Sequence, residues 1–150
     1  MTPTQDLALT SPDIGASRSR LMVGNDFVAS VPGVALHAQY RLVDGRRLAV
    51  TADDTLAEDI VNIVLVSPQF EVLDVLSIGG AYAPMDMVSN ISPLGPDSFQ
   101  FDFLGRWNVR IHPVSARFRR VPKGAPIAPG LFGSAQRWLK PTFLELYENA

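Results

Sequence analysis

Residues 97 to 113 read DSFQFDFLGRWNVRIHP and contain the clearest fold signal in the chain. Apolar and polar side chains alternate on both sides of a glycine, which is the two-residue period of a half-buried β-strand. A three-residue loop at 103–105 keeps like faces together. The resulting cross-strand pairs are Asp102 with Arg106, Phe101 with Trp107 and Phe99 with Val109. The stretch therefore predicts an antiparallel hairpin with one apolar face and one polar face.

A second hairpin is predicted for residues 34–52, VALHAQYRLVDGRRLAVTA. A two-residue loop at Asp44-Gly45 would place unlike residues opposite one another. A three-residue loop Val43-Asp44-Gly45, with the glycine in the left-handed conformation, keeps the apolar residues on one face. It pairs Tyr40 with Leu48 and Ala38 with Val50. We therefore expect the longer loop.

Several further short apolar runs are separated by turn residues, as in all-β proteins. The run after Ile60 returns through Ser67-Pro68-Gln69 as a second antiparallel connection, and a closing strand is expected at residues 142–147. We predict an antiparallel barrel or sandwich of about eight strands, formed by one domain at 19–150 after a flexible N-terminal arm at 1–18. Residues 79–97, which contain three glycines and three prolines, are predicted to form a long loop.

One short helix is expected from about Leu56 to Asn62. Thr55 and Glu58 have the spacing of a capping box, and neighbouring aspartates add negative charge near the predicted N-terminus.

Composition excludes several kinds of chemistry. The 150-residue chain has no cysteine, so thiol nucleophiles, Cys-ligated metals and disulfides are excluded. The N-terminal residues lack the apolar run of a secretory signal, and the longest apolar run, at 60–66, is too short to cross a bilayer. We expect a cytoplasmic protein with no membrane contact.

No catalytic or cofactor motif is present. His37 and His112 lie outside any metal-ligand spacing, and Ser77 and Ser134 are outside the GxSxG motif of serine hydrolases. Gly79-Gly80 lacks the remainder of a phosphate-binding loop and predicts a tight turn instead. We therefore expect no cofactor, no metal and no catalysis, with an enzyme built on one of the histidines as the weakest alternative.

Charge is distributed unevenly along the chain. Residues 1–100 contain 5 basic and 12 acidic side chains, giving −7, whereas residues 101–150 contain 8 and 3, giving +5. Residues 106–124, RWNVRIHPVSARFRRVPKG, contain six basic side chains and no acidic one. In the structural interpretation, the arginines at 106–112 lie on the solvent-exposed face of a strand. The arginines at 114–121 then belong to an edge strand, where their charges prevent pairing with a further strand.

The functional interpretation of the same arginines is a surface that contacts a protein partner. Guanidinium groups match carboxylates bidentately, and arginine is enriched at protein interfaces. The chain's acidic balance disfavours nucleic acid. We expect a non-catalytic protein-binding module, with self-association into a homodimer among its contacts; the main alternative is a β-barrel enclosing an apolar ligand. The candidate binding residues are Arg110, Arg117, Phe118, Arg119, Arg120, Tyr82, Met85 and Met87.

Overall fold

The computed structural model describes residues 1–10, 18–53, 58–81, 87–116 and 141–147. These residues form β-strands joined by turns and bends, and they include no helix. The strands are β1 (Thr2–Pro3), β2 (Leu7–Thr10), β3 (Arg18–Val23), β4 (Asp26–Pro32), β5 (Ala35–Arg41), β6 (Arg47–Ala52), β7 (Glu58–Val66), β8 (Val72–Ala81), β9 (Ser89–Pro93), β10 (Ser98–Asp102), β11 (Arg106–Ala116) and β12 (Thr142–Tyr147). The described residues contain no helix that could span a membrane.

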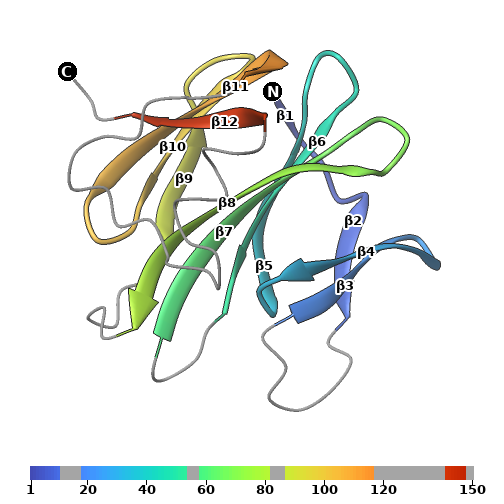
Figure 1. Cartoon of the computed structure of the whole chain (residues 1–150), viewed down its shortest axis with the longest axis horizontal. Coiled ribbons are helices and arrows are strands. Elements are labelled where there is room, and N and C mark those ends of the chain that lie inside the picture. Colours follow the sequence, from blue (N-terminus) through green and yellow to red (C-terminus); the bar gives the residue numbers. More distant parts are fainter. Residues whose placement is uncertain (11–17, 54–57, 82–86, 117–140, 148–150) are drawn as a thin grey trace.

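The strands form three antiparallel sheets arranged as layers (Figure 1). A central five-stranded sheet has the order β1-β5-β6-β7-β8. A four-stranded sheet, β12-β11-β10-β9, packs on one face of the central sheet, and a three-stranded sheet, β2-β3-β4, packs on the other. The all-β prediction is confirmed. The finer expectation of a barrel is not, because the described strands belong to three open sheets.

The inner strands of the central sheet are buried on both faces. In β6, Leu48 and Val50 point into the cluster shared with the four-stranded sheet, whereas Ala49 points into the cluster shared with the three-stranded sheet. In β7, Ile63 and Val64 divide in the same way. Because side chains alternate across a strand, a strand covered on both sides needs apolar residues at every position. This requirement explains the nearly continuous apolar runs in β6 and β7.

The larger apolar cluster lies between the central sheet and the four-stranded sheet. Phe99, Phe101 and Ile111 are fully buried there, and the rings of the two phenylalanines lie 6.0 Å apart. Trp107 is also buried, and its indole Nε1 donates a hydrogen bond to the carbonyl of Phe103 at 3.0 Å. The apolar face of the β10–β11 hairpin therefore supplies much of this core.

Both predicted hairpin registers are confirmed. The β5–β6 ladder pairs Tyr40 with Leu48, and the chain turns through Gly45, whose φ of +85° only glycine adopts at little cost. The β10–β11 ladder has the three expected pairs, which are Phe99 with Val109, Phe101 with Trp107 and Asp102 with Arg106. The β7–β8 connection at 67–69 and the closing strand at 142–147 are found as predicted.

Asp74 on β8 joins the central sheet to the four-stranded sheet. Its Oδ2 accepts hydrogen bonds from the backbone N–H groups of Phe143 and Leu144, at 2.9 and 2.8 Å. These two residues lie on β12, the edge strand of the four-stranded sheet. A single carboxylate oxygen can accept two hydrogen bonds, and here it accepts both from consecutive residues of β12. Asp74 therefore links β8 of the central sheet to β12 of the four-stranded sheet.

Two predictions about the first half of the chain are wrong. The predicted helix at Leu56–Asn62 overlaps β7, which pairs with β6 and β8 from Glu58 onward; residues 54–57 lie outside the described residues. The predicted flexible arm contains β1 and β2, which pair with β5 and β3, and Leu7 is buried. The first ten residues thus belong to the sheets.

Three predictions about later segments need correction. Gly79-Gly80 is part of β8 rather than a tight turn, and β8 and β9 take residues 79–81 and 89–93 of the loop expected at 79–97. The edge strand expected at 114–121 is, as far as Ala116, the end of β11, and Ala116 pairs there with Thr142 of β12. β11 is consequently an interior strand of its sheet.

Candidate binding surfaces

The outer face of the four-stranded sheet carries the first arginines of the basic segment. Arg106 and Arg110 are exposed, and they alternate along β11 with the buried Trp107, Val109 and Ile111. The predicted polar face is confirmed for these arginines. Asn108, which shares that face, is instead fully buried. We call this face the Arg110 surface; besides Arg110 it comprises Arg106, His112, Glu145 and Tyr147.

Arg110 is oriented by an aromatic ring rather than by a carboxylate of the described residues. Its guanidinium carbon lies 5.1 Å from the centre of the Tyr147 ring on β12, a cation–π arrangement. Glu145 is directly opposite Arg110 in the β11–β12 ladder, but its Oε2 contacts His112 Nε2 at 2.6 Å. Within the described residues no acidic side chain pairs with Arg110. Among the described residues, the contact that orients its guanidinium group is therefore the Tyr147 ring.

Arg106 differs from Arg110 because an acid binds it. Its Nε donates to Asp102 Oδ1 at 2.8 Å, and Asn90 Nδ2 donates to Oδ2 of the same carboxylate at 2.7 Å. The hydrogen bond from Arg106, followed by that from Asn90, holds the pKa of Asp102 at about 2, below its ordinary value of 3.8. Asp102 also raises the pKa of Arg106. This end of the surface is neutralised within the protein.

The lowered pKa of Asp102 gives a testable pH dependence. A carboxyl whose pKa is lower in the folded state stabilises the fold above its unfolded pKa, and it loses that contribution as pH falls through the folded pKa. We expect replacing Asp102 with Asn to abolish a small part of the acid destabilisation between pH about 4 and about 2. Urea unfolding of both proteins across this range measures the difference. Parallel pH profiles would contradict the assignment.

Most of the predicted binding residues lie outside the described residues. These are Arg117, Phe118, Arg119, Arg120, Tyr82 and Met85. Met87 is described and is 73% exposed, so its side chain is accessible to a partner. Of the predicted binding residues, the structure therefore places two. Arg110 lies on β11, and Met87 lies just before β9.

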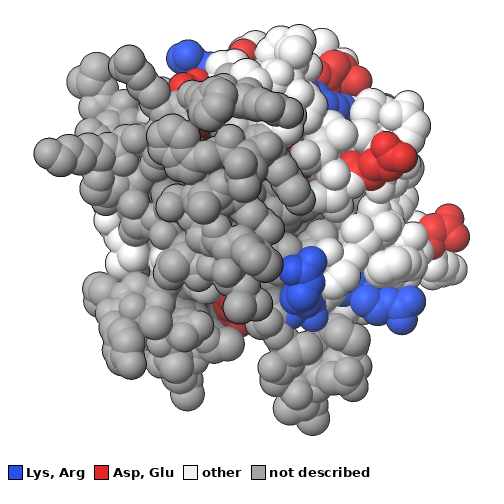
Figure 2. Space-filling view, viewed as in Figure 1, with Lys and Arg blue, Asp and Glu red and all other residues white. Residues whose placement is uncertain are grey.

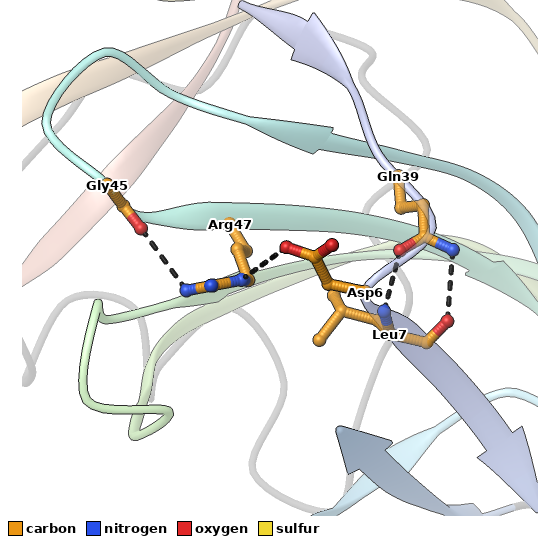
Figure 3. A network of polar contacts seen from close by, with 5 residues as sticks. All are labelled: Asp6, Leu7, Gln39, Gly45 and Arg47. Carbon is orange, nitrogen blue, oxygen red and sulfur yellow. Dashed lines mark hydrogen bonds and ion pairs between the residues drawn. The ribbon is translucent and has the colours of Figure 1, made fainter. Parts of the chain in front are cut away.

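The two arginines that follow the β5–β6 turn have structural roles that the sequence analysis missed. Arg47 is buried and lies 4.3 Å from the centre of the Phe70 ring. Its Nε contacts Asp6 Oδ2 at 3.3 Å and its Nη1 donates to the Gly45 carbonyl (Figure 3). The Thr4 side chain and, more weakly, Arg47 lower the pKa of Asp6. Arg47 thereby attaches the N-terminal segment to the central sheet.

Gln39 attaches the same segment a short distance away. Its Oε1 accepts from the Leu7 N–H at 2.8 Å, and its Nε2 donates to the Leu7 carbonyl at 3.0 Å (Figure 3). The side-chain amide thus bonds both backbone groups of one residue, as a neighbouring strand would. Together with Arg47 it fixes the start of β2.

Arg46 points to the opposite side from Arg47. It is buried, its Nε and Nη2 each lie 2.7 Å from Asp44 Oδ2, and its Nη1 donates to the His112 carbonyl at 2.8 Å. Its guanidinium carbon is 5.7 Å from the Phe143 ring centre. Consecutive residues of a strand point to opposite faces, so Arg46 and Arg47 reach different layers. From the sequence, this alternation along a strand could have indicated that the two adjacent arginines contact different layers.

A groove of about 280 Å³ follows the edge of the central sheet beside β5. It is lined by Pro3, Thr4 and residues 36–40. Tyr40 borders it, donates to the Ile91 carbonyl at 3.3 Å, and has a pKa raised by burial. The lining contains neither aspartate, glutamate, lysine nor arginine. The groove therefore lacks the charge that distinguishes the Arg110 surface.

The described residues contain no group of three or more His, Asp or Glu side chains arranged to hold a metal ion. Comparison of the chain with protein-family models, with curated proteins and with solved structures found no match. The described residues define an all-β protein of three antiparallel sheets.

Proposed function

We propose that the protein is a non-catalytic, cytoplasmic module that binds another protein, including a second copy of itself, through the Arg110 surface. The observation that carries this proposal is the state of Arg110. It is exposed, oriented by Tyr147, and without an acidic partner among the described residues, although Glu145 lies opposite it. We include Arg117, Phe118, Arg119 and Arg120, which follow β11 in the sequence, and Tyr82, Met85 and Met87 in the same contact.

The chemistry of the surface supports a protein partner. Arginine and tyrosine are enriched among the residues that dominate binding energy at protein interfaces. A guanidinium that is already held over a ring loses less conformational freedom when it binds a carboxylate than a freely rotating one. Arg110 and Tyr147 are therefore a suitable anchor for an acidic residue of the partner.

The packed interior favours this function over a barrel that encloses an apolar ligand. The large side chains between the central and four-stranded sheets fill the space that such a ligand would need. Phe99, Phe101, Phe103 and Ile63 have at most 1% of their surface exposed. A ligand there would have to displace close-packed side chains.

Charge reversal tests the proposed function. We expect Arg110→Glu, and the triple change of Arg117, Arg119 and Arg120 to Glu, each to weaken partner capture or self-association by at least about tenfold, because the guanidinium donors are replaced by like charge. Analytical ultracentrifugation measures self-association, and immobilised variants measure partner capture. Arg41→Glu is the matched control, since Arg41 is an exposed arginine on β5 of the central sheet. An unchanged oligomeric state together with unchanged capture in both variants would defeat the proposal.

A further inference from the structure

The outer face of the three-stranded sheet forms a second arginine surface, on a different layer of the fold. Along β3, Arg18 and Arg20 are exposed and alternate with the buried Ser19 and Leu21. Phe27 on β4 is 53% exposed. By the strand registers, the described residues of this face are Ala8, Thr10, Arg18, Arg20, Met22, Phe27, Ser30 and Pro32. We call this set the β3 surface.

Contacts within the face hold both arginines in position. Arg18 Nε donates to Ser30 Oγ at 3.1 Å, and Arg18 Nη2 donates to the Ser30 carbonyl at 2.7 Å. The Arg20 guanidinium carbon lies 5.1 Å from the centre of the Phe27 ring. Both side chains thus lie across β3 toward β4, and both guanidinium groups remain open to solvent on their outer sides.

The positive charges of this face are not neutralised by an acidic side chain among the described residues. The first 100 residues contain five basic side chains, which are Arg18, Arg20, Arg41, Arg46 and Arg47. Two of these, Arg46 and Arg47, contact Asp44 and Asp6. Within the described chain, Arg18 and Arg20 have no acidic partner, and the β3 surface contains no acidic residue. Figure 2 shows basic side chains gathered where Figure 1 places β3. Within residues 1–100, whose net charge is −7, this is a local concentration of positive charge.

We propose that the β3 surface binds an extended acidic peptide of a partner protein. Arg18 and Arg20 are two residues apart on one strand, about 6.6 Å. Carboxylates at alternate positions of an extended peptide have the same spacing, so one can meet each guanidinium. An apolar side chain of the peptide then packs on Phe27 and Met22. The charge of this face and the spacing of its arginines both match such a peptide.

Single-stranded nucleic acid is the weaker match for the same face. Nucleic-acid affinity depends on neutralising several phosphates along the backbone, and this face offers two guanidinium groups and one ring. The net charge of −2 of the whole chain opposes a polyanion at long range. A short peptide with two or three carboxylates meets less of this repulsion.

Fluorescence anisotropy with defined probes tests the proposal. The acidic probe is a labelled peptide in which Asp alternates with Thr on both sides of one Leu, and the neutral probe has Asn in place of Asp. We expect the acidic probe to bind the wild-type protein, and the double change Arg18→Gln and Arg20→Gln to weaken that binding at least about tenfold. Phe27→Ser should weaken it about threefold, because Arg20 loses its ring contact. Binding should also weaken as salt is added.

Control variants separate this surface from a general effect of charge and from the Arg110 surface. Arg41→Gln removes a charge from an exposed position of the central sheet, and it should leave binding of the acidic probe unchanged. A greater loss of binding in Arg110→Gln than in the double variant of Arg18 and Arg20 would assign the peptide to the Arg110 surface and overturn the present inference. Equal binding of the neutral probe, tighter binding of labelled oligothymidylate, or no binding of the acidic probe would overturn it as well. Because Arg18, Arg20 and Phe27 are exposed, thermal unfolding should show the variants to be folded.

Discussion

Replacing Phe101 with alanine is expected to lower the free energy of unfolding by about 3 to 5 kcal/mol, the largest effect of any single change considered. Phe101 is fully buried, lies opposite Trp107 in the β10–β11 ladder, and packs near Phe99. Truncation removes its apolar surface from the core and leaves a cavity that the surrounding strands fill only in part. Domains of this size are typically stable by about 5 to 15 kcal/mol, so this is a large fraction of the total.

Urea unfolding monitored by tryptophan fluorescence measures this loss, since Trp107 is in the same cluster. Phe27→Ala is the matched control because the same ring is removed from an exposed position, where a change within about 0.5 kcal/mol is expected. Equal losses in the two variants would show that Phe101 is not a core residue.

Replacing Arg46 with alanine should destabilise the protein by about 2 to 3 kcal/mol. Hydrogen bonds that involve a charged group are worth about 1.5 to 3 kcal/mol, and Arg46 is 7% exposed. The change deprives the His112 carbonyl of its donor and removes the cation that faces Asp44. Asp44, whose side chain is 47% exposed, recovers part of its hydration and limits the loss.

Denaturant unfolding of Arg46→Ala, Arg46→Lys and Arg110→Ala measures the free energy of unfolding of each variant. The comparison separates the loss of the whole side chain, the loss of the guanidinium geometry and the loss of an exposed charge. Arg46→Lys should recover only part of the stability, because an ammonium group cannot reproduce the planar fork that bonds Asp44 and the His112 carbonyl together. Arg110→Ala, at an exposed arginine, should change stability by no more than about 0.5 kcal/mol. A similar small effect at Arg46 would contradict its role in joining the layers.

The two hairpins could be predicted from the sequence because their signal is local. In each hairpin, apolar and polar residues alternate along two strands that are joined through a glycine with positive φ. Only one register of the two strands keeps the apolar residues on one face. Phe101 and Trp107 were placed in the core for this reason. Which sheet packs on which could not be predicted, because that depends on contacts between residues far apart in the chain.

The wrongly predicted helix shows local preference overridden by tertiary pairing. Thr55 and Glu58 have capping-box spacing, yet the chain from Glu58 pairs with β6 on one side and β8 on the other. Two complete ladders satisfy more backbone groups than one short helix, and β7 is buried on both faces. A capping motif followed by Ile60, Val61 and Ile63 was therefore better interpreted as the start of a strand.

The arginines show how much of the candidate site the sequence revealed. The basic segment at 106–124 drew attention to Arg110, whose exposure the structure shows. Arg46 and Arg47 are adjacent in sequence, and their structural roles depend on Asp44, His112 and Asp6. Arg18 and Arg20 stand out only when their lack of acidic partners among the described residues is known. Sequence locates the charges, but the fold determines which of them are neutralised.

Arginine-specific labelling of the folded protein tests the central claim that its arginines divide into buried links between layers and exposed contact groups. After brief treatment with phenylglyoxal, mass spectrometry of proteolytic fragments should show rapid modification of Arg18, Arg20 and Arg110. Arg46 and Arg47, which are 7% and 9% exposed, should react only after the protein is unfolded in urea. Modification of Arg46 and Arg47 in the folded protein at the rate of the exposed arginines would contradict the claim.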